Sequence, residues 1–260
     1  MSTAQTTPFG SALRHWRRLR GVSQLDLAGA AATTTRHLSY LETGRSRPSR
    51  EMVERLADAL VIPLRERNRL LEQAGLASSY PESALVADDL AAFRSVLDRL
   101  LSTHEPYPAF VVDRHWNLVA ANTATQRVFP HQPGTNTVRL LIDTLSPLIE
   151  NWMDVAPALV ERIAADLMRN PDDEQLRELH DYATAALPPG ARARNPPPGR
   201  VVCPRFRLDG TIVRTITVAA RFESTADVTL DELRVELIYP EDADSDRFFH
   251  QRAAHSRGAS

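Results

Sequence analysis

The side chains best suited to chemistry in this sequence lie between residues 34 and 50. Thr35, Arg36, Ser39 and Tyr40 recur at spacings that share one face of a helix over residues 35–43. An arginine fork can donate two hydrogen bonds to O6 and N7 of guanine, and a threonine methyl group can contact thymine. This face therefore predicts a helix that reads bases in the major groove of double-stranded DNA.

Basic and amide side chains flank that helix. Three arginines follow it, and Gln24 begins the helix that precedes it, which are the side-chain types that hold phosphates. The alternative is a solvated helical bundle that binds no nucleic acid. The predicted DNA contacts are Gln24, Thr34, Thr35, Arg36, Ser39, Tyr40, Arg45, Arg47 and Arg50.

Groups for covalent or metal chemistry are scarce. All 31 basic residues are arginine, which excludes lysine Schiff bases and the lysine of a phosphate-binding loop. Cys203 is the single cysteine, and the histidines are scattered without metal-ligand spacing. His104 beside Glu105 is the one acid–base candidate, and a histidine at a helix end is the simpler interpretation. We therefore expect no enzyme, no metal and no cofactor.

The first 77 residues are predicted to form five short helices. Phe9, Leu13 and Trp16 repeat at helical spacing. Ser23, Thr34 and Ser49 are placed to cap the second, third and fourth helices, and the third helix is expected to end at Gly44. Pro63 is expected at the first position of a fifth helix that ends at Gly75.

The string SQLDLA…TTTRHLSYLETGRSRPS resembles the DNA-binding domain of XRE (lambda-repressor-like) regulators over residues 9–75. The resemblance implies a scaffold ion pair between Arg17 and Glu42, and the alternative is two exposed surface charges. At the turn between the second and third helices this chain has Ala32 where the family usually has glycine. A left-handed turn there would cost alanine about 1 kcal/mol.

A polar, proline-interrupted linker over residues 78–87 is expected to lead to a second domain over 88–245. Its pattern is a helix, two short strands around residues 113–115, helices over about 147–169 and 173–186, and three strands over 201–208, 211–222 and 228–239. Asp209-Gly210 predicts a tight hairpin. The fold expected is α+β around an antiparallel sheet, followed by a disordered tail over 246–260.

The strings HEPYPAFVVDRHWNLVAANTA and NTVRLL…NWMDVAPALVERI resemble the MmyB-like ligand-binding domain. The resemblance implies a PAS-like fold and a small apolar ligand such as a fatty acid. It is weak after residue 170, where residues 187–200 carry five prolines and are expected to form a mobile loop or a pocket lid. The candidate pocket residues are Phe110, Val112, Trp116, Leu118, Phe129, Leu140, Ile142, Ile216 and Val218.

Charge is distributed unevenly along the chain, whose net charge is −2. Arginines exceed acids in residues 1–77, while acids exceed arginines in the remainder, as in a basic polyanion-binding module joined to a body with another role. The polar start predicts no export signal, and no apolar run is long enough to span a membrane. A cytoplasmic protein is expected.

These patterns predict a homodimeric transcriptional regulator that binds an inverted-repeat operator and senses a small apolar ligand. The first alternative is a regulator whose second domain only dimerises or binds a protein partner. The second alternative is an enzyme fused to a DNA-binding domain, which the missing catalytic groups disfavour.

Overall fold

A computed structural model describes residues 7–85, 87–129, 132–191, 202–222 and 226–257 of the chain. The chain divides into two compact units. One unit is Met1–Ser83 with Thr225–Val228, and the other is Ala84–Ser224 with Thr229–Ser260. The part of residues 187–200 beyond Ala191 lies outside the described residues, as do Val201 and the last three residues.

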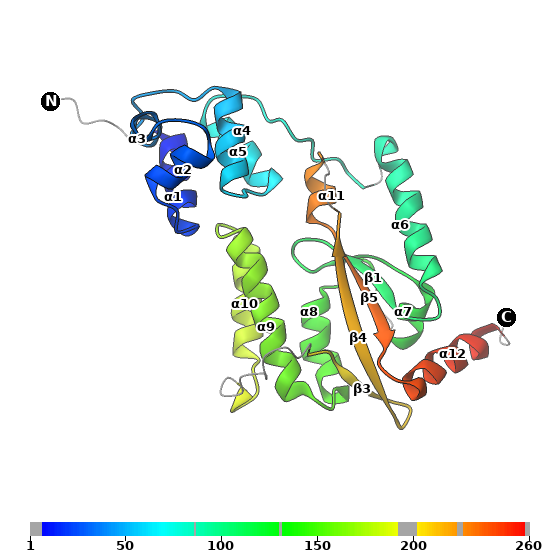
Figure 1. Cartoon of the computed structure of the whole chain (residues 1–260). Helices are drawn as coiled ribbons and strands as arrows, with labels where there is room; N and C mark the ends of the chain where they lie inside the picture. Colours follow the sequence, from blue (N-terminus) through cyan, green and yellow to red (C-terminus); the bar gives the residue numbers. More distant parts are fainter. Residues whose placement is uncertain (1–6, 86, 130–131, 192–201, 223–225, 258–260) are drawn as a thin grey trace. The chain divides into compact units, whose positions relative to one another are not determined.

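The first unit contains the five predicted helices (Figure 1). They are α1 (Pro8–Leu19), α2 (Gln24–Ala30), α3 (Thr35–Glu42), α4 (Arg50–Ala59) and α5 (Leu64–Gln73). Ser23, Thr34 and Ser49 each accept a hydrogen bond from the backbone N–H three residues later, as their capping positions predict. Pro63 precedes α5 rather than occupying its first position.

Apolar side chains from all five helices converge on one core. The fully buried members include Leu13, Leu27, Leu38, Leu41, Leu56 and Leu71. Gly10 lets α1 approach the end of α3 closely, because a Cβ atom there would stand 2.7 Å from the backbone oxygens of Leu41 and Glu42. The backbone contact between α1 and α3 therefore depends on the absence of a side chain at this position.

The turn between α2 and α3 has the left-handed backbone that the family comparison implies. Ala32 has a φ of 49°, and the next residue, Thr33, donates its N–H to the carbonyl of Ala28 at 2.8 Å. The left-handed conformation puts the alanine Cβ close to backbone oxygen, at a cost of about 1 kcal/mol. The turn that orients α3 is thus retained without glycine.

The second unit is built on a five-stranded antiparallel sheet of order β2-β1-β5-β4-β3. The strands are β1 (Ala109–Val112), β2 (Leu118–Ala121), β3 (Arg205–Leu208), β4 (Thr211–Arg221) and β5 (Arg234–Pro240). Asp209 and Gly210 both have positive φ, 48° and 79°, which confirms the predicted tight hairpin between β3 and β4.

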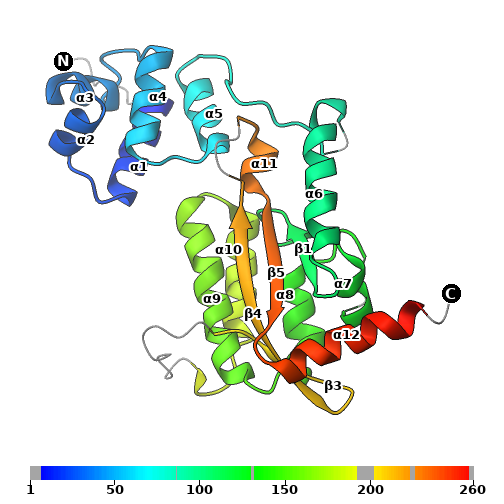
Figure 2. The same ribbon diagram turned by 45° about the vertical axis from the view of Figure 1, so that its right-hand side comes forward.

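Helices cover both faces of this sheet (Figure 2). The helical elements that follow the first five helices along the chain are η1 (Asp88–Leu90), α6 (Ala91–Thr103), α7 (Thr123–Val128), α8 (Thr137–Leu140), η2 (Leu141–Leu145), η3 (Ser146–Leu148), α9 (Trp152–Arg169), α10 (Glu174–Ala185), α11 (Val228–Glu232) and α12 (Ala243–Arg257). Helix α6 packs on Ala109, Val111 and Val235, while α8, α9 and α10 stand on the opposite side.

Two predicted strands are shorter than expected. The strand predicted over 228–239 begins only at Arg234, because residues 228–232 form α11 with Leu230 and Leu233 buried at helical spacing. The strand predicted over 201–208 begins at Arg205 within the described residues, directly after Pro204. Proline has no N–H to donate to a strand ladder.

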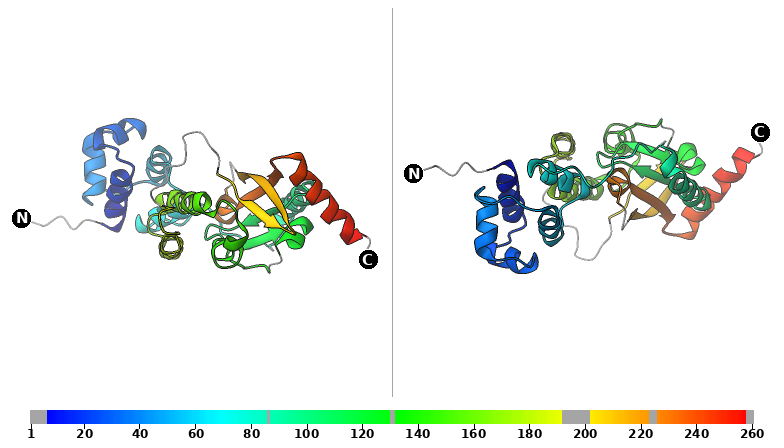
Figure 3. Two further views of the ribbon diagram at one scale, coloured as in Figure 1. Left: turned by 90° about the horizontal axis from the view of Figure 1, so that it is seen from below. Right: turned by 90° about the horizontal axis from the view of Figure 1, so that it is seen from above.

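The expectation of a disordered tail over 246–260 is wrong for residues up to Arg257. These residues belong to α12, which lies beside the end of the sheet that β3 and β4 form (Figure 3). Phe248 and Phe249 are buried against Phe206 and Val213, so apolar burial holds the helix in place. In the described part of the chain, no helix is both long enough and apolar enough to cross a membrane.

Candidate nucleic-acid interface and ligand cavity

Helix α3 separates its polar residues from its buried ones. Thr35 and Arg36 are exposed and Ser39 and Tyr40 are half-buried, whereas Leu38 and Leu41 are fully buried on the opposite side. Thr34 accepts the N–H of His37 at 3.1 Å and so fixes the first turn. The geometry brings together the four side chains predicted to face a major groove, and their contact with bases stays a prediction.

Tyr40 holds two arginines beside this face. Arg36 donates its Nε–H to the Tyr40 hydroxyl at 3.1 Å, and its guanidinium carbon lies 5.4 Å from the ring centre. Arg45 lies 5.9 Å from the same ring. Because the Nε atom of Arg36 is engaged, the outer nitrogens of its fork are oriented together, which suits bidentate hydrogen bonding to guanine.

A buried carboxylate anchors α3 from behind. Glu42 is 1% exposed, and its Oε1 and Oε2 accept hydrogen bonds from Arg17 Nε at 2.6 Å and Arg17 Nη2 at 3.1 Å. Burial by itself would raise the pKa of Glu42, but hydrogen bonds from Arg17 and Gln24 outweigh it and lower the pKa. The scaffold pair predicted from the resemblance is confirmed.

The predicted phosphate contacts differ in their surroundings. The Gln24 amide donates to Glu42 Oε2 at 2.8 Å, and Arg50 donates to Ser79 Oγ and to the carbonyl of Ala77. Arg45 and Arg47 are exposed. Phosphate contacts stay predictions at all four positions, and the structure gives Gln24 and Arg50 an additional role within the folded unit.

The second unit contains a partly open cavity of about 130 Å³ between its sheet and helices α8 and α9. The wall is largely apolar, and Phe129 and Phe206 meet there with ring centres 4.8 Å apart. The lining residues include Phe110, Trp116, Leu118, Phe129, Leu140, Leu141, Leu145, Leu159, Arg162, Phe206, Thr215, Thr217, Glu236 and Ile238. An apolar wall with few polar groups is typical of small-molecule sites.

Five of the nine predicted pocket residues line this cavity: Phe110, Trp116, Leu118, Phe129 and Leu140. The other four do not. Val112 is fully buried and Ile142 packs among helices α8 to α10, so both belong to the core. Ile216 and Val218 are 43% and 46% exposed on the other face of β4. The prediction was therefore wrong at these four positions.

Alternation along β4 explains the error there. Successive side chains of a strand point to opposite faces, and Thr215 and Thr217 are the residues of β4 that line the cavity. The sequence analysis selected the apolar residues instead of the threonines between them. It also missed Arg162 and Glu236, for which no spacing signal exists because they lie on α9 and β5, 74 residues apart.

Charged side chains form a chain of ion pairs at one end of the cavity wall. Arg162 and Arg234 lie 2.5 Å and 2.7 Å from Glu236 Oε1, which is buried at 2% exposure. Asp166 accepts from Arg234 at 2.8 Å and from Arg221 at 2.6 Å. Burial lowers the pKa of Arg234, and the nearby Glu236 and Asp166 oppose that effect.

Trp116 lines the cavity and also contacts two of these arginines. Its ring lies 3.8 Å from the guanidinium carbon of Arg234 and 4.9 Å from that of Arg162. The residue lies in the β1–β2 turn, with a φ of 67° that is unusual for a bulky side chain. Neighbouring contacts hold this turn in place, since Asp113 accepts the N–H groups of His115 and Asn117.

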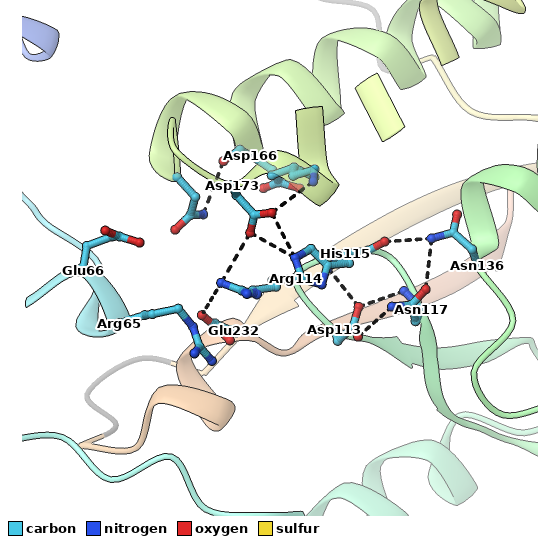
Figure 4. A network of polar contacts seen from close by, with 12 residues as sticks. Arg65, Glu66, Asp113, Arg114, His115, Asn117, Asn136, Asp166, Asp173 and Glu232 are labelled. Carbon is cyan, nitrogen blue, oxygen red and sulfur yellow. Dashed lines mark hydrogen bonds and ion pairs between the residues drawn. The ribbon is translucent and has the colours of Figure 1, made fainter. Parts of the chain in front are cut away.

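The same turn is attached to the start of α10 (Figure 4). Asp173, which caps α10, lies 3.0 Å from His115 Nε2 and 3.3 Å from Arg114 Nη1, and Arg114 is also 3.5 Å from Glu232. Burial by itself would raise the pKa of Asp173. The Leu176 N–H, Arg114 and His115 outweigh that effect, so the pKa is lowered. These contacts fix the turn that carries Trp116.

Other candidates for chemistry have structural partners. His104 Nε2 lies 3.0 Å from the carbonyl oxygen of Ile238, and Glu105 accepts the N–H of Ala124. Within the described residues, no group of three metal-ligating side chains comes together. The thiol of Cys203 accepts the N–H of Thr217 at 3.3 Å.

Comparison with known proteins adds two family matches. Residues 93–251 match the model described as the MmyB-like transcription regulator ligand binding domain, and residues 8–70 match a helix-turn-helix domain. A structure of an RNA-binding light-oxygen-voltage receptor is 13% identical to this chain, and the match covers 98% of this chain and 64% of the receptor chain. Its TM-score of 0.23 is too low to indicate a shared fold.

The curated relatives are mycobacterial. Uncharacterized HTH-type transcriptional regulators of Mycobacterium bovis and Mycobacterium tuberculosis are 30% identical over 133 residues. The match covers 40% of this chain and 52% of each relative, so the chain spans about half the length of the curated relatives it matches.

Proposed function

Because the chain belongs to the family of the MmyB-like transcription regulator ligand binding domain, we propose that it is a ligand-responsive, DNA-binding transcriptional regulator. The observation that carries the proposal is the pairing of a helix-turn-helix unit with a second unit that contains a partly open apolar cavity. Such a protein would act in the cytoplasm on chromosomal DNA, without catalysing a reaction.

The DNA-binding half of the proposal rests on α3. Its exposed polar residues face away from the core, and Glu42 and Arg17 fix the helix from behind. Arg45 and Arg47 are exposed, as contact with a backbone phosphate requires. We propose base contacts from Thr35, Arg36, Ser39 and Tyr40, with phosphate contacts from the flanking arginines.

Selection from random DNA duplexes tests this half. A single short helix reads few base pairs, so we expect an inverted repeat with half-sites about 34–36 Å apart, or a multiple of that distance. Enrichment of an asymmetric single site, bound tightly by one protomer, would contradict the dimeric arrangement. Failure to enrich any sequence would contradict specific DNA binding.

We propose that the sheet provides the surface that a second copy of the chain binds. Ile216 lies directly opposite Tyr239 and Val218 opposite Leu237. Val96 of α6 lines one groove together with Leu237 and Tyr239. Val96, Val218, Ile216 and Tyr239 are 39–58% exposed, and contiguous apolar patches mark interaction sites. Arg99 and Glu105 line the same groove, so an antiparallel copy of this face would bring opposite charges together.

Sedimentation of the full chain checks the proposed dimer surface. Ile216→Glu should convert the dimer to a monomer, because it places a charge within the apolar contact. Met168→Glu is the matched control, since Met168 is 63% exposed on α9 and lies outside the patch. A dimer that survives Ile216→Glu would exclude this surface, and a monomeric wild-type chain would exclude dimerisation itself.

The sensing half rests on the cavity, for which the family resemblance implies a fatty acid. Extraction of purified protein followed by mass spectrometry should recover a bound apolar molecule in stoichiometric amount. Recovery of no such molecule, with no change in DNA affinity on adding fatty acids, would favour the alternative in which the second unit only dimerises or binds a protein partner.

A further inference from the structure

Residues 77–83, which we call the strap, follow α5 and are held against helices α4 and α5. Asn68 of α5 donates to the Tyr80 carbonyl at 2.7 Å and accepts the N–H groups of Ser79 and Tyr80 at 3.0 and 3.1 Å. The Tyr80 hydroxyl donates to Glu54 Oε2 of α4 at 2.7 Å. Because its backbone groups have these partners, the strap is a structured part of the first unit.

The strap also binds one of the predicted phosphate contacts. Arg50, the exposed first residue of α4, donates from Nη1 to Ser79 Oγ and from Nη2 to the Ala77 carbonyl, the latter at 2.8 Å. Bidentate binding of a phosphate uses the paired nitrogens of an arginine fork. The strap and a DNA phosphate therefore compete for the same guanidinium group.

The other end of the strap is bound where α11 begins. Ser83 donates its N–H to Asp227 Oδ2 at 3.1 Å, and the Pro81 carbonyl accepts the N–H of Val228 at 2.9 Å. Asp227 and Val228 are 7% and 1% exposed, so water competes little for these hydrogen bonds. Val228 is also the first residue of α11, whose other residues belong to the second unit. A displacement of α11 would therefore pull directly on the strap.

Within the second unit, α11 is connected to the cavity wall in two ways. Glu232, the last residue of α11, lies 3.5 Å from Arg114, which is two residues before Trp116 of the wall (Figure 4). The chain also continues from α11 into β5, where Glu236 lines the cavity. A molecule that displaces β5 or the β1–β2 turn would thus displace α11 through contiguous contacts.

We propose that the strap competes with DNA for Arg50, and that α11 sets how firmly the strap is docked. The inference rests on the proposed ligand-responsive regulator and identifies the element that joins its two halves. With the strap docked, Arg50 is withheld from phosphate and DNA affinity is lower. When α11 is displaced, the strap loosens at Asp227 and Val228, and Arg50 gains a phosphate contact. A ligand that prefers one of these two arrangements shifts the balance between them.

Titration of DNA with the full chain tests the competition for Arg50. Ser79→Ala removes the hydroxyl that binds Arg50. The variant should bind operator and random DNA alike about two- to fivefold more tightly, with a slope of log affinity against log salt concentration steeper by up to about one. Ser78→Ala is the matched control, because Ser78 is the neighbouring exposed serine and donates to Glu72 instead. It should leave affinity and slope unchanged.

Arg50→Ala completes a double-mutant cycle. In the Arg50→Ala background, Ser79→Ala should have no effect on DNA affinity, because the group for which the strap and DNA compete is gone. Wild-type affinity in Ser79→Ala, or a gain that persists in the Arg50→Ala background, would overturn the competition. Absence of DNA binding by the wild-type chain would instead overturn the proposed DNA-binding function, and this inference with it.

The connection to α11 is tested at Asp227. Asp227→Ala removes the acceptor of the Ser83 N–H, and Ser83→Pro removes the donor of the same hydrogen bond. Each variant should raise the DNA affinity of ligand-free protein as Ser79→Ala does, and should reduce the change in operator affinity on adding fatty acid at least about threefold. Asp88→Ala, at an exposed acid of η1 outside the strap, should behave as wild type.

Wild-type DNA affinity in both Asp227→Ala and Ser83→Pro would overturn the role of α11. A wild-type chain whose operator affinity does not respond to fatty acid would contradict the proposed sensing function. The comparison in ligand-free protein would still decide whether the strap withholds Arg50 from DNA.

Discussion

The exposed face of α3 and the cavity of the second unit use fixed charges in opposite ways. Behind α3, the buried pair of Glu42 and Arg17 is fully hydrogen-bonded and positions side chains that it does not itself present to a partner. In the cavity wall, Arg162 and Glu236 themselves line the space that we propose for a ligand, and the Trp116 indole N–H has no acceptor among the described residues.

This difference separates a scaffold from a binding site. A completed ion pair stabilises one conformation and gains nothing from a further partner. An incomplete set of donors is stabilised by whatever molecule supplies the missing acceptor. Substitutions behind α3 should therefore act on stability first and on DNA binding through it, whereas substitutions at the cavity should act on ligand affinity.

The largest effect is expected at the scaffold pair. Glu42→Ala removes the buried carboxylate to which Arg17 and Gln24 donate hydrogen bonds, and should lower the free energy of unfolding by about 3 kcal/mol. Because the pKa of Glu42 is lowered on folding, this stabilisation is present above its ordinary value of 4.5 and is lost as the pH falls below it. Urea denaturation of wild type and variant across this range measures both effects.

The exposed Glu51 of α4 is the control for that experiment. Glu51→Ala should change the free energy of unfolding by less than about 0.5 kcal/mol. Similar losses in the two variants would show that the pair behind α3 has no special role.

A smaller effect is expected from backbone contact between α1 and α3. Gly10→Ala introduces a Cβ atom against two backbone oxygens, which cannot yield as a flexible side chain could, and should cost about 2 kcal/mol. Gly29→Ala is the same substitution in α2 with no atom within 4 Å, and should stabilise the protein by about 0.5–1 kcal/mol. Thermal unfolding distinguishes the two, and a neutral Gly10→Ala would refute the close contact.

Base and phosphate contacts should separate in binding experiments. Arg36→Ala should weaken binding to the selected operator by about 1–3 kcal/mol and spare random DNA. Arg47→Ala should weaken binding to operator and to random DNA alike. It should also reduce the slope of log affinity against log salt concentration by about one, the amount expected for one lost phosphate contact. An unchanged preference for operator over random DNA in Arg36→Ala would show that a different face of α3 reads the bases.

Local patterns predicted the first unit well because its determinants are local. Caps at Ser23, Thr34 and Ser49 and the apolar spacing of each helix lie within a few residues of one another. The pairing of Arg17 with Glu42 came from a family resemblance, and Ala32 adopts the left-handed turn that this comparison implies. The spacing of residues within one helix predicts neither feature, because Arg17 and Glu42 lie on different helices and Ala32 lies in the turn between two helices.

The cavity was only partly predictable because it depends on tertiary contacts. Phe110 and Leu118 were correctly placed from short apolar runs, but strand alternation put Thr215 and Thr217, not Ile216 and Val218, in the wall. A shift of one residue exchanges the two faces of a strand. Glu236 and Arg162 meet across distant segments, and the helix over 243–257 is held by Phe248 and Phe249, which gave no helical period in a polar stretch.

The central claim, that the cavity controls DNA binding, is tested most directly by titrating operator DNA with lipid-stripped protein, with and without a saturating concentration of added fatty acid. A ligand changes operator affinity only if it prefers one of two conformations of the protein. We predict a fivefold to 150-fold change, the usual range for a coupling of about 1–3 kcal/mol. Superimposable titration curves, at a fatty-acid concentration that calorimetry shows to be saturating, would contradict the claim.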